Sequence, residues 1–366
     1  MQRRFFLRSA GALALLPALP DTAFAALPGA GQQPGTLAVY AGAIGPGMYA
    51  AGDFAHARFH DPRGMAVDAH GNVFVADYVN SVVRRLTPQG EVDIVAGRVE
   101  QRDAADGPAP QARFYSPECV AVGTDGVLYV SDSGSETVRR IGRYGTVSTL
   151  AGAIGIEGYA DGPGTSARFN HPVGLGVDRQ GNVFVADAYN ATVRRIAPGG
   201  EVTTLAGTAG ATGWRDGVGA RARFNTPVGL ALDAAGNVYV SEYFNHTIRR
   251  ITPDGRVSTV AGVPGKAGFG DGPAKQALFR HPQSLAFAPD GSLIVADTGN
   301  SRVRRIVFGS DVRTLAGGTE GETVVPGPLP AELRAPYGVA ALADGSILVT
   351  GMNAILRIVL PEPLKA

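Results

Sequence analysis

Short apolar runs alternate with polar, glycine-containing turns along most of this chain. Between Phe169 and Gly207 the runs read GLGVD, NVFVAD, ATVRRI and EVTTLAG, and the turns between them contain Gly, Pro or Asn. Runs of this length, rich in Val, Ile, Leu and Thr, are typical of β-strands and are too short for helices. The pattern therefore predicts four antiparallel strands in this segment.

The same runs recur along the chain at a fixed period. The motif VADAYNATVRRI and its copies begin at Val75, Val130, Val185, Val240, Val295 and, in a degenerate form, Val349. The starts are evenly spaced, except that the last interval is shorter by a single position. A fixed period of this kind indicates units that bury their faces against their neighbours. Six units of four strands predict an all-β fold, a six-bladed β-propeller.

The ends of the repeated region indicate how the ring closes. The segment TLAVYAG, from Thr36 to Gly42, matches the fourth run of the units, such as TLAG at Thr149, but lies before the first unit. The last unit ends with AILRIV and lacks a fourth run of its own. We expect the N-terminal strand to complete the last blade, because this closure removes exposed sheet edges.

The repeat resembles a known family. The pattern F-x-x-P-x-G-L-x-V-D-x-x-G-N-V-x-V-A-D-x-x-N-x-x-V-R-R-I, seen at Phe169 to Ile196, is similar to the NHL repeat, and the resemblance covers essentially the whole chain after the first segment. It implies a six-bladed propeller but no single activity. Related propellers include RNA-binding modules, scaffolds, a peptide-amidating lyase and, more distantly, lactonases and strictosidine synthase-like enzymes. Function therefore has to be argued from the site.

The first 25 residues have the features of an export signal. Arg3-Arg4-Phe5-Phe6-Leu7-Arg8 resembles the twin-arginine motif, an apolar stretch follows at 9–19, and Ala23-Phe24-Ala25 is an A-x-A cleavage site. An ordinary Sec signal is the alternative. We expect residues 1–25 to be removed and residues 26–366 to form one propeller in the periplasm or outside the cell.

Charge and cysteine content exclude several function classes. Residues 26–366 contain 30 basic and 31 acidic side chains, so their net charge is about −1, which argues against a nucleic-acid or anionic-membrane binder. Cys119 is the only cysteine, so no internal disulfide can form. No later apolar run is long enough for a permanent membrane span. We expect a monomer that binds a small molecule, a peptide or a protein.

Features that every blade repeats are interpreted as structural. The arginine pairs, such as Arg194-Arg195, are expected to pair between blades with the carboxylates that end the second run, such as Asp187. The Asp-Gly pairs are interpreted as Asx-type turns. The recurrent aromatics of the long loops are interpreted as plugs that hold each loop on its blade, with a stacking rim as the alternative. These aromatics are Tyr49, Tyr159, Trp214 and Phe269.

The position after the proline that begins each unit is different, because its residue changes from unit to unit. The six residues are Arg63, Glu118, Val173, Val228, Gln283 and Tyr337. In related enzymes this position points into the central channel, so we interpret Arg63, Glu118, Gln283 and Tyr337 as a ligand-binding rim. The alternative is a water-filled channel with a plain Arg63–Glu118 ion pair.

The chemistry of this rim stays open at this point. Glu118 is a candidate base or ligand for a divalent metal such as calcium, whereas His60, His171 and His281 are not expected to converge on zinc. No nucleophile elbow, phosphate loop or CxxC motif occurs, and no catalytic residue is assigned. The sequence favours a binding module. The alternative is a metal-assisted hydrolase, similar to gluconolactonases or paraoxonases, or a lyase.

Overall fold

The computed structural model describes residues 34–318 and 323–365. The expected export signal at 1–25 lies outside the described residues. No helix in the described segments is long and apolar enough to cross a membrane. The fold described below is that of residues 34–365.

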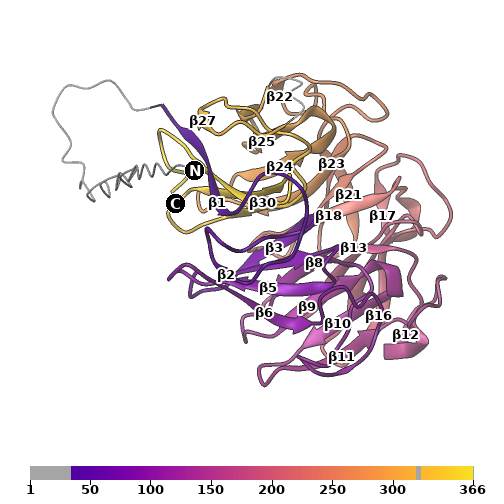
Figure 1. Ribbon diagram of the computed structural model, residues 1–366. Helices are drawn as coiled ribbons and strands as arrows, with labels where there is room; N and C mark the ends of the chain where they lie inside the picture. The colour runs from indigo at the N-terminus through magenta and orange to yellow at the C-terminus, as the bar shows by residue number, and fades with distance from the viewer. Residues whose placement is uncertain (1–33, 319–322, 366) are drawn as a thin grey trace, which may run out of the picture. The chain divides into compact units, whose positions relative to one another are not determined.

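Six antiparallel sheets of five strands each form the fold (Figure 1). The innermost strand of each sheet contacts the innermost strand of the next, in the order β3, β8, β13, β18, β23 and β28, and β28 contacts β3 again. The sheets therefore close into a ring around a central channel. This arrangement confirms the prediction of a six-bladed β-propeller.

The sheets are numbered here as blades in chain order. Blade 1 contains β2 (Gly52–Asp53), β3 (Pro62–Val67), β4 (Val73–Asp77), β5 (Val82–Leu86) and β6 (Glu91–Gly97). Blade 2 contains β7 (Gly107–Pro108), β8 (Pro117–Val122), β9 (Leu128–Asp132), β10 (Thr137–Ile141) and β11 (Thr146–Ala151). Blade 3 contains β12 (Gly162–Pro163), β13 (Pro172–Val177), β14 (Val183–Asp187), β15 (Thr192–Ile196) and β16 (Glu201–Gly207).

The remaining blades follow the same plan. Blade 4 contains β17 (Gly217–Val218), β18 (Pro227–Leu232), β19 (Val238–Glu242), β20 (Thr247–Ile251) and β21 (Arg256–Ala261). Blade 5 contains β22 (Gly272–Pro273), β23 (Pro282–Phe287), β24 (Leu293–Asp297), β25 (Arg302–Ile306) and β26 (Asp311–Ala316). Blade 6 contains β27 (Gly327–Pro328), β28 (Val339–Ala341), β29 (Ile347–Gly351), β30 (Ala354–Val359) and β1 (Thr36–Gly42). Four short 3-10 turns occupy Ser133–Ser135, Gly164–Ser166, Gly219–Arg221 and Thr298–Asn300.

The fifth strand of each sheet adds to the predicted four. It contains only two residues and comes from the long loop that leads into the blade, here called the leading loop. In blade 3, Gly162 pairs with Val202 and Pro163 with Glu201, at the outer edge of the sheet. The leading loop thus runs along the outer edge before it turns to the channel. Gly162 takes a φ of 132°, which only glycine adopts readily.

The N-terminal strand closes the ring as predicted. β1 lies between β27 and β30, with Thr36 opposite both Pro328 and Val359. In Figure 1 the indigo strand β1 runs beside the yellow strand β30. The last blade is therefore built from both ends of the described chain. The strand β1 covers the edge of β30 that would otherwise be unpaired.

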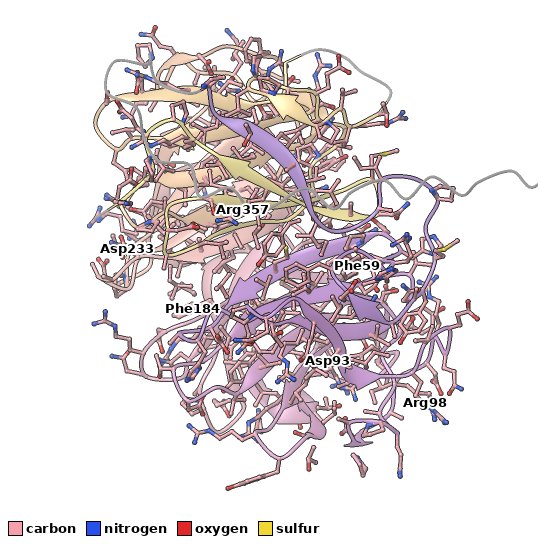
Figure 2. All side chains as sticks on the ribbon, turned by 60° about the vertical axis from the view of Figure 1, so that its left-hand side comes forward. Phe59, Asp93, Arg98, Phe184, Asp233 and Arg357 are labelled. Carbon is pink, nitrogen blue, oxygen red and sulfur yellow. The ribbon has the colours of Figure 1, made fainter. Side chains whose placement is uncertain are left out.

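Packing between blades explains the composition of the strands. Every residue of β14 is buried, because each blade presses on a neighbour at both faces. Phe59 lies inside blade 1, whereas Arg98 lies at its edge (Figure 2). The innermost strands approach so closely that a Cβ at Gly174 would lie 2.2 Å from the carbonyl oxygen of Val228. Glycine at this place lets the ring close tightly around the channel.

Candidate functional site

The first arginine of each pair is buried within its own blade. In blade 3, Arg194 Nη1 lies 2.7 Å from Asp187 Oδ2, and Arg194 Nη2 lies 2.6 Å from Asp161 Oδ1. Blades 4 and 5 repeat this arrangement with Arg249 and Arg304. The prediction that these arginines pair between blades is wrong, because Arg194 and Asp187 sit on the adjacent strands β15 and β14 of one sheet.

The two carboxylates of this cluster also hold the loops of the blade. Asp187 accepts hydrogen bonds from the Asn190 side chain and from the backbone N–H of Asn170 in the leading loop, both at 2.8 Å. Asp161, from an Asp-Gly pair, accepts from the N–H and hydroxyl groups of Thr204 at 3.1 and 3.0 Å. These aspartates therefore join the leading loop to the outer strands of the blade, a wider role than the expected Asx-type turn.

The repeated aromatic residues cover these buried arginines. The guanidinium of Arg194 lies 4.8 Å from the ring centre of Tyr159 and 5.2 Å from that of Phe169. The Tyr159 hydroxyl bonds the Thr204 hydroxyl at 2.9 Å, and Trp214 Nε1 donates to Thr259 at 2.9 Å in the next blade. Each ring thus belongs to its own blade, which confirms the interpretation of these aromatics as plugs.

Blade 6 lacks the whole cluster. Leu356, opposite Val349, occupies the place that Arg194 takes opposite Val185 in blade 3. Gly351 ends the second strand where other blades have a carboxylate, and Pro326 precedes β27 where blades 2 to 5 have aspartate. Blade 6 therefore lacks the arginine and both carboxylates, whereas blade 1 has Ala51 in place of the second carboxylate and keeps the pair of Arg84 and Asp77.

Three of the four predicted rim residues meet at the mouth of the channel. Arg63 Nη1 lies 2.5 Å from Glu118 Oε1, and the Tyr337 hydroxyl donates to the same oxygen. Glu118 Oε2 accepts from the Ser133 hydroxyl at 3.3 Å, and the Glu118 side chain is 2% exposed. Asp61 binds the other side of the Arg63 guanidinium at 2.9 Å. Blades 6, 1 and 2 thus contribute to one polar cluster, here called the channel cluster.

The charges of the channel cluster are fixed by these contacts. Burial alone would lower the pKa of Arg63, but the attraction of Glu118 and Asp61 outweighs burial and raises it, so the guanidinium stays charged. Burial, together with the nearby Glu118 carboxylate, raises the pKa of Tyr337 well above its usual value. Tyr337 is therefore a neutral donor toward Glu118. The ring of Tyr78 lies 3.4 Å under the Arg63 guanidinium and supports its position.

The fourth predicted residue, Gln283, lines the same channel but stands apart from the channel cluster. Glu118, Val173, Val228, Gln283 and Tyr337 line a channel cavity of about 50 Å³. A water molecule needs roughly 10–15 Å³ measured in this way, so the cavity holds only a few waters. A ligand larger than that has to bind above it, at the mouth.

The donor set does not suit a metal ion. Both oxygens of Glu118 already accept hydrogen bonds, from Arg63, Tyr337 and Ser133. Across residues 34–318 and 323–365, no group of three or more His, Cys, Asp or Glu side chains gathers in a way that could hold an ion. A cation beside Glu118 would have to displace the Arg63 guanidinium. Cys119, behind Glu118, has its pKa raised to about 11 by burial and stays a thiol.

The other half of the mouth is aromatic. His171 stacks on Tyr189 with 4.6 Å between ring centres, and His281 stacks on Tyr243 at 4.3 Å. Tyr243 packs on Val173, Ala188 and Val228 above the channel cavity. Tyr189 and Phe244 are 60% and 52% exposed. We call these rings of blades 3 to 5 the aromatic arc. The sequence signal for it was the connector after strand two, which varies from blade to blade.

His171 of the aromatic arc and His246, which packs on His281, have lowered pKa values. Burial lowers the pKa of His171, and burial with the nearby His281 lowers the pKa of His246. The backbone N–H of His281 donates to His246 Nδ1 at 3.2 Å, so this nitrogen carries no proton. One half of the mouth thus carries the charged channel cluster, and the other half is lined by rings.

Two segments of the chain match a known repeat family, and each lies within one blade. The NHL repeat matches residues 169–196 and 279–306, which hold the three inner strands of blades 3 and 5. Two of the six blades thus match the NHL repeat along their three inner strands.

Similar proteins share parts of this repeat array. The chain is 30% identical over 287 residues to the protein SUPPRESSOR OF QUENCHING 1 of Arabidopsis thaliana, a match that covers 73% of the chain and 27% of that protein. It is 28% identical over 288 residues to human NHL repeat-containing protein 2, which covers 69% of the chain and 40% of that protein. The chain thus spans less than half the length of the curated relatives it matches.

Solved structures confirm the fold alone. An auxiliary nutrient binding protein from Bacteroides thetaiotaomicron matches with a TM-score of 0.67 and 15% identity, over 90% of this chain and 77% of that one. A virginiamycin B lyase from Staphylococcus aureus, solved with quinupristin, matches with a TM-score of 0.53 and 13% identity, over 82% and 95%. At these identities the likeness concerns the propeller fold and not its chemistry.

Proposed function

We propose that this protein is a binding module that takes a small molecule or peptide at the mouth of its central channel. The observation that carries the proposal is the channel cluster: Arg63, Glu118 and Tyr337 come from three blades and meet at one carboxylate oxygen. None of these residues is required by the repeat. Buried charged groups that the fold does not repeat are typical of a site that fixes the orientation of a ligand.

The aromatic arc supports the same proposal. Exposed rings at Tyr189 and Phe244 face solvent on the half of the mouth opposite the channel cluster. A ligand with an apolar ring and a polar end fits this division, because the ring gains stacking area and the polar end reaches Arg63 or Asp61. The nutrient binding protein with the same fold is consistent with a binding role for this chain.

The test is a thermal-shift screen with the purified protein. The panel contains amino acids, nucleosides, monosaccharides and lactones, and each hit is repeated with Glu118→Gln and with Arg313→Leu as a surface control. We expect the melting temperature to rise by several degrees with a bound ligand, because ligand binding stabilises only the folded state. The rise should vanish in Glu118→Gln and persist in Arg313→Leu. Equal shifts in both variants would place the ligand elsewhere.

The alternative function is a metal-assisted hydrolase or a lyase, as the lyase with this fold suggests. It requires Glu118 to leave Arg63 and bind an ion or act as a base. Metal analysis of the purified protein and a panel of lactones and esters test this alternative. One divalent ion per chain that is lost in Glu118→Ala, together with turnover, would replace the binding module by an enzyme.

The cellular setting is also part of the proposal. We propose that the chain is exported through its N-terminal segment and works as a monomer in the periplasm or outside the cell, without nucleic-acid partners. The sequence 1–25 and the near-neutral charge support this proposal. N-terminal sequencing of the secreted protein, with a start near Ala26, checks it.

A further inference from the structure

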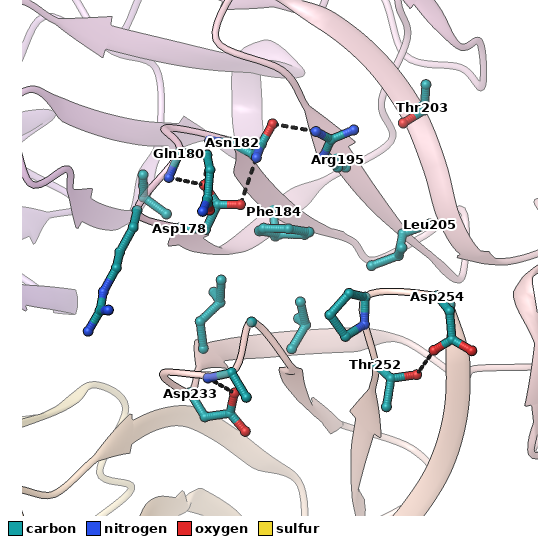
Figure 3. Close-up of a pocket in the computed structure, with 18 of the residues that line it drawn as sticks. Asp178, Gln180, Asn182, Phe184, Arg195, Thr203, Leu205, Asp233, Thr252 and Asp254 are labelled. Atoms are coloured by element: carbon teal, nitrogen blue, oxygen red, sulfur yellow. Dashed lines mark hydrogen bonds between the residues drawn. The ribbon is translucent and has the colours of Figure 1, made fainter.

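A large groove lies between blades 3 and 4 and shares no lining residue with the channel cavity. Its volume is about 960 Å³, within the size range of small-molecule sites. Figure 3 shows Phe184 and Leu205 on the wall formed by blade 3, with Asp233, Thr252 and Asp254 on the wall formed by blade 4. The turns between strands one and two and between strands three and four surround it, so it opens on the face opposite the channel mouth.

The neighbouring gap differs from this groove in its aromatic rings. Between blades 4 and 5, Tyr239 contacts Phe287 and Phe308, with 5.1 Å between ring centres in each pair. The three residues that precede these by one repeat are Phe184, Leu232 and Pro253, and all three line the groove. The first gap holds three rings, whereas the second holds one ring, a leucine and a proline. The two smaller side chains leave room for a ring within the groove.

Another gap is filled by the chain as well. Leu364 from the C-terminal tail is 5% exposed and packs with Ala288 and Ile294 of blade 5 and Val339 of blade 6. Apolar groups from the chain thus fill the gaps on both sides of blade 5. The floor of the groove at blades 3 and 4 is made of the same kind of surface, with Phe184 and Val238 buried beneath it.

The rim of the groove carries more negative than positive charge. Three carboxylates, from Asp178, Asp233 and Asp254, line it together with two guanidinium groups, from Arg179 and Arg195. Arg195 already donates to Asn182 at 2.6 Å (Figure 3). Asp254 is exposed at the tip of the turn between strands three and four. A cation above the apolar floor is therefore favoured over an anion.

We propose that this groove is a second binding site, for a small aromatic molecule that carries a positive charge. The aromatic ring takes the place that Phe308 fills in the next gap and packs on Phe184 and Leu232. The charged end faces Asp233 or Asp254. The site lies apart from the channel cluster, so it goes beyond the proposed function and stands whether or not a ligand binds at the channel mouth.

The experiment uses tryptamine as the probe and measures its Kd on the full chain by titration calorimetry or ligand-detected NMR. A ligand of this size is expected to bind with a Kd of about 1 mM. Indole-3-acetate, which reverses the charge, and 2-cyclohexylethylamine, which lacks the aromatic ring, should each bind at least about threefold more weakly. Absence of tryptamine binding up to about tenfold its expected Kd would overturn the proposal.

Two filling variants and one control variant localise the site. Pro253→Phe copies Phe308 into the groove and should weaken tryptamine binding at least about tenfold by filling the ring position. Pro88→Phe places the same ring at the same turn of blade 1 and should leave the Kd within about twofold. Leu232→Phe copies Phe287 and serves as a second filling variant if Pro253→Phe melts early. Unchanged tryptamine binding in both folded filling variants would overturn the proposal.

Discussion

The protein buries an arginine against carboxylates in two kinds of place. In blade 3, Arg194 is fully buried between Asp187 and Asp161, and similar clusters recur in other blades. At the channel mouth, Arg63 is 19% exposed and pairs with Glu118 and Asp61, in an arrangement that occurs once. The chemistry is alike, but only the first is required by the repeat. Recurrence therefore separates the groups that hold the fold from those available to a ligand.

Blade 6 shows that the repeated polar cluster is not required in every blade. Its Leu356 and Gly351 replace the arginine and the carboxylate, and Leu356 is fully buried. A blade can thus be stabilised without the polar cluster, and blade 1 keeps Arg84 and Asp77 without the second carboxylate. In general, an intact buried ion pair stabilises a protein little more than apolar side chains of similar volume do. Removing only one partner is strongly destabilising, because the other charge stays buried without a partner.

The largest expected effect comes from breaking one blade cluster. Arg194→Leu leaves the carboxylates of Asp187 and Asp161 without their shared cation and should lower the free energy of unfolding by about 3–5 kcal/mol. Urea denaturation followed by circular dichroism measures the change. Arg195→Leu, at the exposed neighbour, is the matched control and should cost about 0.5 kcal/mol. A similar loss in both variants would contradict the distinction between the two arginines.

The second prediction concerns pH. Burial raises the pKa of Asp77 to about 6 in the folded protein, above its ordinary value of 3.8, although Asn80, His60 N–H and Arg84 oppose the shift. The stabilising contribution of Asp77 is complete below about pH 4 and is lost as the pH rises through 6, because ionisation is harder in the folded state. The free energy of unfolding of Asp77→Asn, relative to that of the wild type, should therefore rise by about 2–3 kcal/mol between pH 4 and pH 7.

Unfolding curves of the wild type and Asp77→Asn at pH 4, 5, 6 and 7 test this expectation. The quantity to compare is the difference in the free energy of unfolding between the two proteins at each pH, because the other carboxylates change the stability of both proteins alike. Asp311→Asn, at a partly exposed aspartate whose pKa is lowered by the hydrogen bond from Arg313, is the control. A difference that stays constant with pH would show that Asp77 ionises normally in the fold.

The third prediction measures the coupling inside a cluster. In the cycle of Arg194→Leu, Asp187→Ala and the double variant, the double variant should be more stable than the sum of the single losses by about 2 kcal/mol. The reason is that the second change removes a carboxylate that the first left unpaired. Chemical denaturation of all four proteins gives the coupling energy. Additive losses would contradict the energetic coupling of Arg194 and Asp187.

The smallest expected effect is at the channel cluster. Tyr337→Phe removes the hydroxyl that donates to Glu118 but keeps the ring, and Arg63 and Ser133 still satisfy the carboxylate. The free energy of unfolding should fall by about 1 kcal/mol, the typical value of one hydrogen bond. Thermal unfolding measures it. A loss as large as that of Arg194→Leu would give the channel cluster a structural role.

The sequence predicted most of the fold because its period is so regular. Six copies at nearly equal intervals and a displaced fourth strand at Thr36 were sufficient for the ring and its closure. The fifth strand was missed, since two residues such as Gly162 and Pro163 show no alternation. The arginine pairing was assigned to the wrong sheets, because composition does not tell which side chains meet across a hairpin.

The candidate site was predicted only in part. Disagreement among the copies identified Arg63, Glu118 and Tyr337, and the structure brings them together. It also selected Gln283, which lines the channel cavity without joining them. The aromatic arc and the groove between blades 3 and 4 depend on rings that pack between neighbouring blades. The sequence does show that Pro253 stands one repeat before Phe308. Only the three-dimensional packing shows that these two positions lie in gaps between neighbouring blades.

The most direct test of the distinction between repeated and unrepeated clusters is the thermal unfolding of the double variant Arg63→Met/Glu118→Gln, measured with and without a ligand found in the screen. Both charges are removed together, so no buried charge is left without its partner. The melting temperature without ligand should stay within about 2 °C of the wild type, and the rise caused by the ligand should disappear. A variant that unfolds as readily as Arg194→Leu, or one that keeps the full rise with ligand, would contradict the assignment of the channel cluster to ligand binding.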